Sequence, residues 1–361
     1  MAIEIRELRD DNEARELQRI GRRSFHPGFF LLIPKPKWAF GAFDDGTCLG
    51  GVYLKKIAGV GLVEFIFIAK EGRGHGLGKR LTERALEAFR EQGIETAVAS
   101  VRDDNTASWN LFAGRGFHAL SLAAFVRQFG LGRAFLISLA SAQAFAFGFD
   151  LWAGSVDAAL SSNPPTPDAR EAVPGGSLSS LIGHLFLNLL PVTAAVWRFG
   201  ESYAQLATAL GLVIVARLLF GYLGSLPFYR PARLRMARGG WLIEVPVQIF
   251  GSTFFYPAHW QPKLAHWREP DFRRGLGVSA LLSILGVMAV LGAASLLLAS
   301  GALTSVFAVG TALITVDVAK LVLILEAQPL FEAWSGPRVR RWNLPVYLVV
   351  LAGAIALVAF A

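Results

Sequence analysis

The sequence has few charged residues and almost no cysteine. Only 17% of its 361 residues are charged, against about 25% in soluble domains, and 53% are hydrophobic. This balance excludes a purely soluble enzyme and a disordered protein. The single cysteine, Cys48, cannot form an internal disulfide, which excludes a disulfide-stabilised secreted module. The first 25 residues are highly charged and have no apolar stretch typical of a secretory signal, so we expect the N-terminal region to lie in the cytoplasm.

Motifs that would indicate a metal or a nucleic acid are missing as well. The six histidines include no H-E-x-x-H pair, and no zinc-ligand spacing occurs, so we expect no metal site. The formal net charge of +8 comes without a basic recognition helix, and we expect no nucleic-acid partner. The basic residues after residue 130 instead cluster in short loops between apolar runs, which is typical of membrane proteins.

Charge divides the chain into two regions. Residues 1–130 hold 35 charged side chains, whereas residues 131–361 hold only 27. We therefore predict a soluble domain over residues 1–130 and an all-α, multi-pass membrane domain over residues 131–361, with the lipid bilayer as its partner. About six apolar runs, several of the roughly 20 residues that cross a bilayer, occur at 134–153, 178–197, 203–225, 276–300, 302–325 and 344–361. The run 241–257 is interrupted by a glutamate, a glycine and two prolines, and we expect it to be re-entrant or interfacial.

Positive charge gives conflicting information about the orientation of these spans. The basic clusters before the first run and after the third should both lie in the cytoplasm, with the acidic loop 154–177 outside. Placing both clusters on one side requires an even number of crossings, but three runs lie between them. The weakest spans are 134–153, which carries Asp150, and 203–225, which carries Arg217.

The first 130 residues alternate between strand and helix patterns. Strands are predicted over residues 2–8, 37–46, 47–59, 61–69, 94–101 and 116–128, and helices over residues 11–22, 78–93 and 105–116. Asp45-Gly46 is typical of a tight hairpin turn between the second and third strands. The order predicts a compact α+β domain.

A glycine-rich turn carries the chemical signal. The segment EFIFIAKEGRGHGLGKRL, residues 64–81, runs from a strand through the turn into a helix. Alternating glycines let main-chain N–H groups approach a phosphate, and the N-terminus of the helix attracts an anion. Arg73 and Lys79 add positive charge. The spacing fits neither a Walker loop nor a dinucleotide fold, so the residues alone predict a phosphate or pyrophosphate site.

Three segments resemble the GNAT (Gcn5-related N-acetyltransferase) superfamily. RGHGLG, residues 73–78, is similar to its R/Q-x-x-G-x-G/A signature, and VEFIFIA before it resembles the fourth strand of that family. NTASWNLFAGRGF, residues 105–117, resembles the second motif of the family, and the likeness covers about residues 2–128. The resemblance implies a mixed central sheet flanked by helices, acetyl-CoA as the cofactor and transfer of its acetyl group to an amine acceptor.

The resemblance also implies roles for particular residues. The main chain of Phe67 and Ile68 would pair with the pantetheine arm. Asn105 would contact the cofactor from the next helix. The pyrophosphate would be held by the amides of Arg73, Gly74, His75, Gly76, Leu77 and Gly78, next to the charge of Lys79.

Glu64 is the candidate general base. Many family members carry a glutamate at this position of the central strand, and it would act through a water. The alternative is a strand-edge carboxylate that merely pairs with a lysine. The family's usual general acid, a tyrosine, is replaced by Phe112, and its frequent proline and aromatic residue are replaced by Lys70 and Gly72. These replacements leave the expected cofactor binding intact, but they remove a group that catalysis in this family usually uses.

Other polar residues have simpler interpretations. We expect His75 to be a loop residue whose main chain matters more than its side chain. Cys48 is expected to be an ordinary strand residue, and Trp109 to pack against its helix's neighbours. In the apolar run 302–325, Asp317 and Lys320 lie on one helix face; they either pair with each other or form a polar path with Arg217. We expect His184 to make a hydrogen bond to a neighbouring helix rather than bind a metal.

The end of the chain, SGPRVRRWNLPV, resembles the end of archaeal site-2 metalloproteases. The zinc-binding aspartate of that motif is Ser335 here, so the resemblance implies a scaffold without protease activity. Two main functions follow from these patterns. The first is a membrane-anchored N-acetyltransferase, and the second is a non-catalytic acyl-CoA sensor coupled to that scaffold. A transporter or remnant protease built on the membrane half is the third alternative.

Overall fold

The computed structural model describes most of both regions of the chain. The described residues are 3–24, 33–102, 105–141, 149–161, 164, 181–186, 188, 203–229, 232–236, 258–262, 269–328 and 334–361. The chain divides into two compact units, of which the first runs to Pro174 and the second takes up nearly all that follows. Each unit is described separately below.

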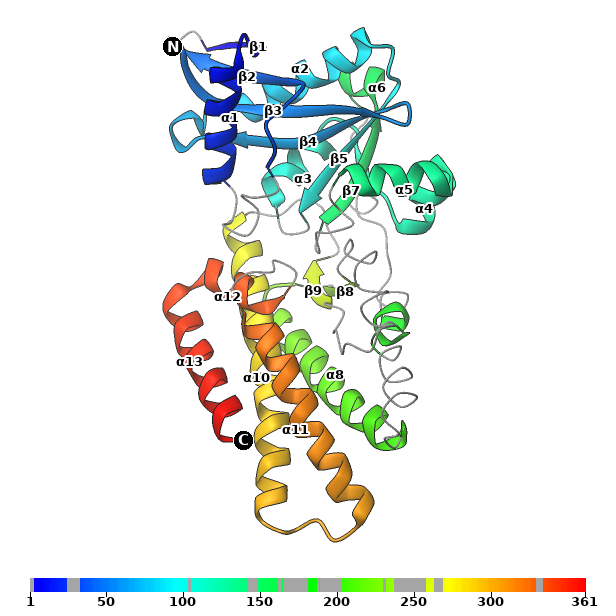
Figure 1. Cartoon of the computed structure of the whole chain (residues 1–361), viewed down its shortest axis with the longest axis vertical. Helices are drawn as coiled ribbons and strands as arrows, with labels where there is room; N and C mark the ends of the chain where they lie inside the picture. Colours follow the sequence, from blue (N-terminus) through cyan, green and yellow to red (C-terminus); the bar gives the residue numbers. More distant parts are fainter. Residues whose placement is uncertain are drawn as a thin grey trace. The chain divides into compact units, whose positions relative to one another are not determined.

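A seven-stranded sheet forms the centre of the first unit (Figure 1). In chain order the strands are β1 (Glu4–Glu7), β2 (Ala39–Asp44), β3 (Thr47–Ile57), β4 (Val60–Ile68), β5 (Thr96–Arg102), β6 (His118–Ala119) and β7 (Phe149–Ser155). Their spatial order is β1-β2-β3-β4-β5-β7-β6, and only the β4–β5 pair is parallel. The predicted hairpin turn is confirmed, because Asp45 and Gly46 both have positive φ angles, 45° and 83°.

Helices cover both faces of this sheet. The helices are α1 (Asp11–Ser24), α2 (Leu77–Glu91), α3 (Thr106–Ala113), α4 (Leu122–Phe129), α5 (Leu131–Ala140) and α6 (Val156–Leu160). Side chains of α4 and α5 pack with Leu151 and Ala153 of β7, whereas Trp109 of α3 packs with Trp152. Because successive strand residues point to opposite faces, α4 and α5 lie on the face opposite α3. Leu17 places α1 over β3 and β4 on the face that α4 and α5 also cover.

The end of the first unit differs from the sequence prediction. The expected strand over residues 116–128 is only the two-residue β6, followed by helices α4 and α5. Ser121 caps α4 by accepting a hydrogen bond from Ala124 N, and Gly130, with φ of 77°, ends it. The apolar run 134–153 does not span a membrane as a helix, because its last residues form β7, which pairs with β5 along its whole length. The first unit therefore extends beyond residue 130.

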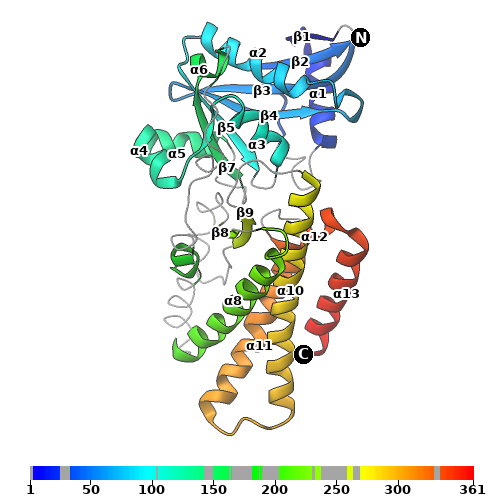
Figure 2. The ribbon, with the colours of Figure 1, turned by 180° about the vertical axis from the view of Figure 1, so that it is seen from behind.

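The second unit is mainly helical, as predicted. Three helices are long and apolar enough to cross a membrane by length and composition. They are α8 (Tyr203–Ser225), α10 (Glu269–Ala299) and α11 (Val306–Ala327); the shorter helices are α12 (Ser335–Trp342) and α13 (Leu344–Phe360), and strands β8 (Ala232–Met236) and β9 (Ala258–Pro262) pair antiparallel. Figure 2 shows α8, α10 and α11 side by side. The predicted segment 241–257, and most of the run 178–197, lie outside the described residues.

Small residues let α8 and α10 approach closely. A Cβ added at Gly224 would lie 3.0 Å from Ser279 Cα, and Ser279 Oγ donates to Gly221 O at 2.7 Å. Close packing through glycine and serine is typical of helices in a bilayer, where burial of apolar surface gives little driving force. Large apolar side chains such as Leu219 and Leu313 are exposed on the outer faces of these helices. This distribution fits helices that contact lipid.

The charges inside this unit are arranged differently from the prediction. Asp317 is exposed and, among the described ion pairs, it makes none with Lys320. Arg217 of α8 instead pairs with Glu326 of α11, and both side chains are almost fully buried. The apolar run predicted over residues 302–325 ends one residue before Glu326, so this partner of Arg217 was not predicted. His184 is buried, and its Nδ1 lies 3.1 Å from the amide nitrogen of Asn188.

Candidate functional site

The central feature of the first unit is a gap between two parallel strands. β4 and β5 pair only from Gly61–Ala97 to Val63–Ala99, although β4 continues to Ile68 and β5 to Arg102. Beyond Val63, the described residues form no ladder with β5, and β5 diverges from β4 (Figure 1). From residue 64 to residue 68, β4 therefore runs without a β5 neighbour in the part of the chain that the structure describes. An extended ligand can add to such an edge through main-chain hydrogen bonds.

A β-bulge at Glu64 marks the point where the strands part. Tyr53 is paired with Phe65 and Leu54 with Val63, so Glu64 is the extra residue on β4. Bulges bend a strand, end a pairing and redirect a side chain, and they are common next to active sites. Here the bulge coincides with the last β4–β5 pair, which brings Glu64 to the start of the gap. Phe67 and Ile68, predicted to pair with a cofactor, lie on β4 beyond its last pair with β5.

The glycine-rich loop follows directly at the end of β4. Residues Lys70–Gly72 form a 3-10 turn, and α2 begins after Gly76. Gly74 and Gly76 have φ angles of 84° and 68°, which residues with a Cβ rarely adopt. A Cβ at either position would meet no atom within 4 Å. These glycines are therefore needed for the course of the main chain, and the space beside them is open to a ligand.

This loop presents unused hydrogen-bond donors. The main-chain N–H groups of residues 74–79 donate to nothing in the part of the chain that the structure describes; the first α2 donor with a partner is Arg80, which bonds to Gly76 O at 3.2 Å. Arg73, His75 and Lys79 are exposed, whereas Leu77 is buried and anchors the helix. Free N–H groups, the positive end of the helix dipole and two cations together form a site for a multiply charged anion.

The opposite side of the gap is formed by the end of β5 and the start of α3. Asn105 follows β5 and caps α3, since its Oδ1 accepts a hydrogen bond from Ser108 N at 3.1 Å. A Cβ at Gly78 would lie 3.6 Å from Ile68 Cδ1 and 3.8 Å from Leu111 Cδ2. The glycine-rich helix thus contacts both β4 and α3. The structure brings the loop, the end of β4 and the Asn105 cap to the same end of the sheet.

Glu64 is paired with a lysine. Lys55 Nζ of β3 donates to Glu64 Oε1 at 2.5 Å and also approaches Ala140 O at 3.5 Å. The Glu64 side chain is only 7% exposed, whereas that of Lys55 is 39% exposed. Burial raises the pKa of the Glu64 carboxyl above its ordinary value, and the hydrogen bond and charge of Lys55 oppose this rise. The pairing predicted as the alternative role of Glu64 is therefore present, next to the gap.

Sequence reasoning did not identify Lys55. The tight turn after Ile57 pairs Lys55 with Leu62, which is two residues from Glu64. Counting back from the turn without a bulge places Tyr53 opposite Glu64 and Lys55 only diagonally next to it. A diagonal pair of opposite charges was the available signal, but the bulge that brings the two side chains together leaves no clear mark in the sequence.

The remaining residues singled out from the sequence do not enter the gap. Phe112 is buried against Phe117, with ring centroids 5.3 Å apart, so this position offers no proton donor. Trp109 is buried, and its Nε1 donates to Arg102 O at 3.0 Å. Cys48 is buried, and burial raises the pKa of its thiol to about 11, which disfavours the reactive thiolate.

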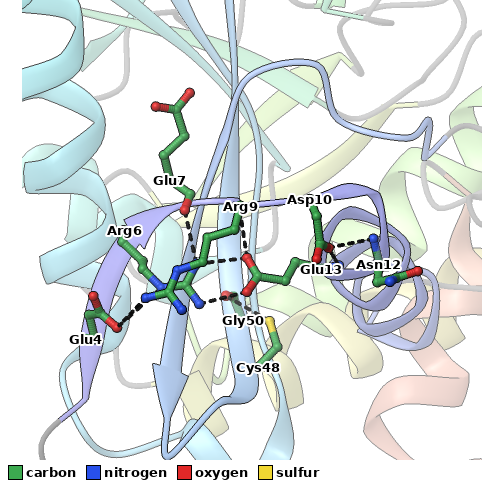
Figure 3. A network of polar contacts seen from close by, with 9 residues as sticks. All are labelled: Glu4, Arg6, Glu7, Arg9, Asp10, Asn12, Glu13, Cys48 and Gly50. Atoms are coloured by element: carbon green, nitrogen blue, oxygen red, sulfur yellow. Dashed lines mark hydrogen bonds and ion pairs between the residues drawn. The ribbon is translucent and has the colours of Figure 1, made fainter.

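A second polar cluster ties β1 to α1 (Figure 3). Both terminal nitrogens of Arg6 donate to the Glu13 carboxylate, at 2.8 and 2.7 Å, and Arg9 N donates to Glu13 Oε2 at 2.8 Å. The hydrogen bond from Arg6 lowers the pKa of Glu13 to about 2. Asp10 Oδ1 accepts from the first turn of the helix, at Asn12 N and Glu13 N. This cluster fastens the edge strand and lies apart from the glycine-rich loop in the sequence.

Comparison with known proteins agrees with this geometry. The model of the acetyltransferase (GNAT) family matches residues 4–117. These residues form a GNAT acetyltransferase domain. The GNAT family uses acetyl-CoA, and the matched range includes the end of β4, the glycine-rich loop and the Asn105 cap. The likeness stated from the sequence is confirmed for this part of the chain.

Two curated relatives match less than a third of this chain. Mycothiol acetyltransferase of Tsukamurella paurometabola is 33% identical over 104 residues, which is 28% of this chain and 35% of the relative. N-alpha-acetyltransferase 30 of Schizosaccharomyces pombe is 28% identical over 87 residues, covering 23% of this chain and 58% of the relative. The chain thus spans about a third of the length of the first relative.

Solved structures resemble the GNAT domain as well. PaiA N-acetyltransferase from Thermoplasma acidophilum, solved in complex with coenzyme A, is 18% identical and covers 43% of this chain and 99% of that chain, with a TM-score of 0.33. The NatC complex bound to Gag peptide and CoA is 18% identical and covers 34% of this chain and 87% of that chain, with a TM-score of 0.29. Nothing supports the resemblance of the membrane region to site-2 metalloproteases. The described residues also contain no group of three potential metal ligands.

Proposed function

We propose that the chain is a membrane-anchored N-acetyltransferase that uses acetyl-CoA and acts on an amine acceptor in the cytoplasm. One observation carries this proposal. Beyond Val63, β4 forms no ladder with β5 among the described residues and leads directly into a loop whose main-chain N–H groups have no acceptor in that part of the chain. The helix that follows begins at an exposed, positively charged end. An extended arm that ends in a diphosphate matches both features at once.

The residues fit each part of that ligand. The main chain of Phe67 and Ile68 would hold the pantetheine arm in the gap. The N–H groups from Gly74 to Lys79, with Arg73 and Lys79, would hold the diphosphate, where Gly74 and Gly76 leave room for it. Acetyl-CoA, when bound, supplies an acetyl group activated as a thioester. Asn105 would contact the ligand from the other side of the gap.

Glu64 would act as the general base for the acceptor. An amine attacks a thioester only after it has lost its proton, and a carboxylate with a raised pKa takes a proton more readily than an ordinary one. Burial of Glu64 raises its pKa, and the bulge brings it to the start of the gap. The hydrogen bond and charge of Lys55 oppose this rise in pKa and favour the charged form of the carboxyl. Since Phe112 cannot donate a proton, water or another group would protonate the departing thiolate.

The orientation of the domain follows from the number of crossings. With the run 134–153 assigned to the soluble domain, two apolar runs remain between the flanking basic clusters. Two crossings return the chain to its original side, so the rule on positive loops is consistent with a cytoplasmic N-terminal domain.

Binding and turnover test this proposal separately. Full-length protein in lipid nanodiscs should bind acetyl-CoA in calorimetry, and Gly76→Glu should abolish binding by adding bulk and negative charge in the anion site. With labelled acetyl-CoA and a panel of amines, Glu64→Gln should lower the transfer rate by about 10²-fold or more while binding is kept. Glu95→Gln, at an exposed position, is the matched control and should leave both unchanged. Absence of binding by the unmodified protein would refute the proposal.

A non-catalytic sensor of acyl-CoA is the second candidate. The buried phenylalanine at position 112 favours it, since the position of the usual proton donor has no ionisable group. Binding of acetyl-CoA without transfer to any amine, and with no effect of Glu64→Gln, would support this function.

A further inference from the structure

Helix α5 exposes an apolar face that no other part of the described chain covers. Leu131, Phe135, Leu136 and Leu139 are 75%, 42%, 50% and 43% exposed, respectively. At 100° per residue these four side chains lie on one continuous side of the helix. Four large apolar residues in so short a helix form an exposed patch of the kind that marks an interaction site.

The opposite face of α5 fixes the helix on the sheet. Ala134, Ile137 and Ser138 are buried, and the first two belong to the cluster with Leu62 and Val98. Arg133 Nε also donates to Ala58 O, at 2.9 Å, in the turn between β3 and β4. The apolar side therefore cannot turn inward. With ten residues, the helix is about 15 Å long, too short to cross a bilayer.

The stretch of sequence that contains α5 carries charge of one sign. It has no Asp or Glu between Asp104 and Asp150. Arg127 near the end of α4 and Arg133 in α5 are both exposed. Figure 1 shows α4 and α5 next to each other within the first unit. Apolar side chains bordered by arginine, without acidic neighbours, suit the interface of a membrane that carries anionic lipids.

We propose that α5 is a membrane-contacting helix. Its four exposed apolar side chains would insert between the headgroups of an anionic bilayer, and Arg127 and Arg133 would lie near the lipid phosphates. Three helices of the same chain are apolar and long enough to cross a membrane by length and composition, which makes a bilayer a plausible surface for this helix to meet. This inference does not depend on acetyl transfer.

A second copy of the chain fits this face less well. A two-fold dimer brings the same surface of each copy together, which would place the arginines of both copies next to each other. The stretch 105–149, which contains both arginines, has no acidic residue of its own to pair with them. An anionic lipid surface satisfies both the apolar and the basic parts of the patch.

Helix α5 ends close to the Lys55–Glu64 pair of the candidate site. Ala140, the last residue of α5, offers its carbonyl oxygen 3.5 Å from Lys55 Nζ, and Lys55 pairs with Glu64. α5 and the bulge thus lie on the same face of the sheet. The membrane contact would hold this face near the lipid surface.

The test uses full-length protein in nanodiscs with an environment-sensitive dye at Leu136→Cys. Cys48 is buried and should not react, so the introduced thiol is labelled selectively. In discs containing phosphatidylglycerol we expect blue-shifted emission and quenching by nitroxide lipids. A dye at Arg90→Cys, exposed on α2 on the other face of the sheet, should show neither.

A charge reversal tests the electrostatic part. Arg127→Glu should reduce the ratio of membrane-bound to free α5 by about fivefold, as expected from about 1 kcal/mol per basic residue. Arg19→Glu, exposed on α1, is the matched control and should leave it unchanged. Equal emission and quenching at positions 136 and 90 would overturn the proposal. So would a disulfide-linked dimer through Leu136→Cys without lipid quenching, since that outcome would assign the face to a second copy.

Discussion

The two units of this chain use paired charges for different purposes. In the first unit, Lys55 is 39% exposed while its partner Glu64 is buried, so one side of the pair is open to solvent. In the second unit, Arg217 and Glu326 are 2% and 0% exposed and join α8 to α11. A half-exposed pair can exchange a proton with its surroundings, whereas a fully buried pair serves mainly to hold helices in one arrangement.

Because the pair in the second unit is fully buried, we expect its loss to have the largest effect on the free energy of unfolding. Glu326 also accepts a hydrogen bond from Ser335 N at 3.1 Å, so it links α11 to the start of α12. Glu326→Leu leaves Arg217 buried without its partner and should lower the free energy of unfolding by about 3–5 kcal/mol. Denaturation in detergent micelles measures this change. Adding Arg217→Met to the same chain should recover most of the loss, and Asp317→Asn, at an exposed position, should have almost no effect.

The next effect concerns the glycine-rich loop. Gly76→Ala places a Cβ at a φ angle of 68° and in the space proposed for the diphosphate, so acetyl-CoA affinity should fall about tenfold or more. Gly93→Ala is the matched control, because Gly93 has a φ angle of 66° at the other end of α2 and also meets no atom within 4 Å. Both variants carry the same backbone strain. Equal loss of affinity in both would contradict a local role for Gly76.

A smaller effect should appear in the pH dependence of transfer. Lys55 lowers the pKa of Glu64, so Lys55→Met should raise this pKa further. A base must be deprotonated to act, and the acidic limb of the pH–rate profile should therefore move to higher pH. Lys56→Met, on the neighbouring residue, should not move it, since Lys56 contacts Gln92 O instead. An unchanged pH–rate profile in Lys55→Met would show that Glu64 is not the base that takes the proton.

The smallest effect is expected at the edge strand. Arg6 holds the pKa of Glu13 at about 2, below the ordinary 4.5, so the unfolded chain binds this proton more readily than the folded one. The stabilisation should be complete above pH 4.5 and disappear as the pH falls through about 2. Glu13→Gln should remove at most about 1 kcal/mol, measured at neutral pH by hydrogen exchange in α1. Glu16→Gln, on the same helix, should leave the exchange unchanged.

The sequence was most informative where structure is local. Strands β2, β3 and β4 and the Asp45-Gly46 turn depend on neighbouring residues, and the sequence predicted each of them. The path of the main chain through Gly74 and Gly76 follows from the same local rules. The sequence therefore indicated the candidate site, whose role stays a prediction.

What could not be predicted depends on distant parts of the chain. β7 has an apolar sequence that resembles part of a membrane span, and only its pairing with β5 and β6 identifies it as a strand. The bulge at Glu64 arises from the pairing of β3 with β4, and Glu326 meets Arg217 across 109 positions of sequence. Periodicity describes one element at a time and has no information about such partners.

The late position of β7 has a consequence for the synthesis of this protein. The family likeness ends at residue 117, but the sheet is completed only by residues 149–155, which lie between β5 and β6. A chain released or cut before β7 would leave the long edge of β5 unpaired, and an unpaired edge strand readily joins that of another molecule. On the ribosome, the domain should therefore reach its protease-resistant state only after β7 has left the exit tunnel. A fragment intended for crystallisation should include β7 and α6.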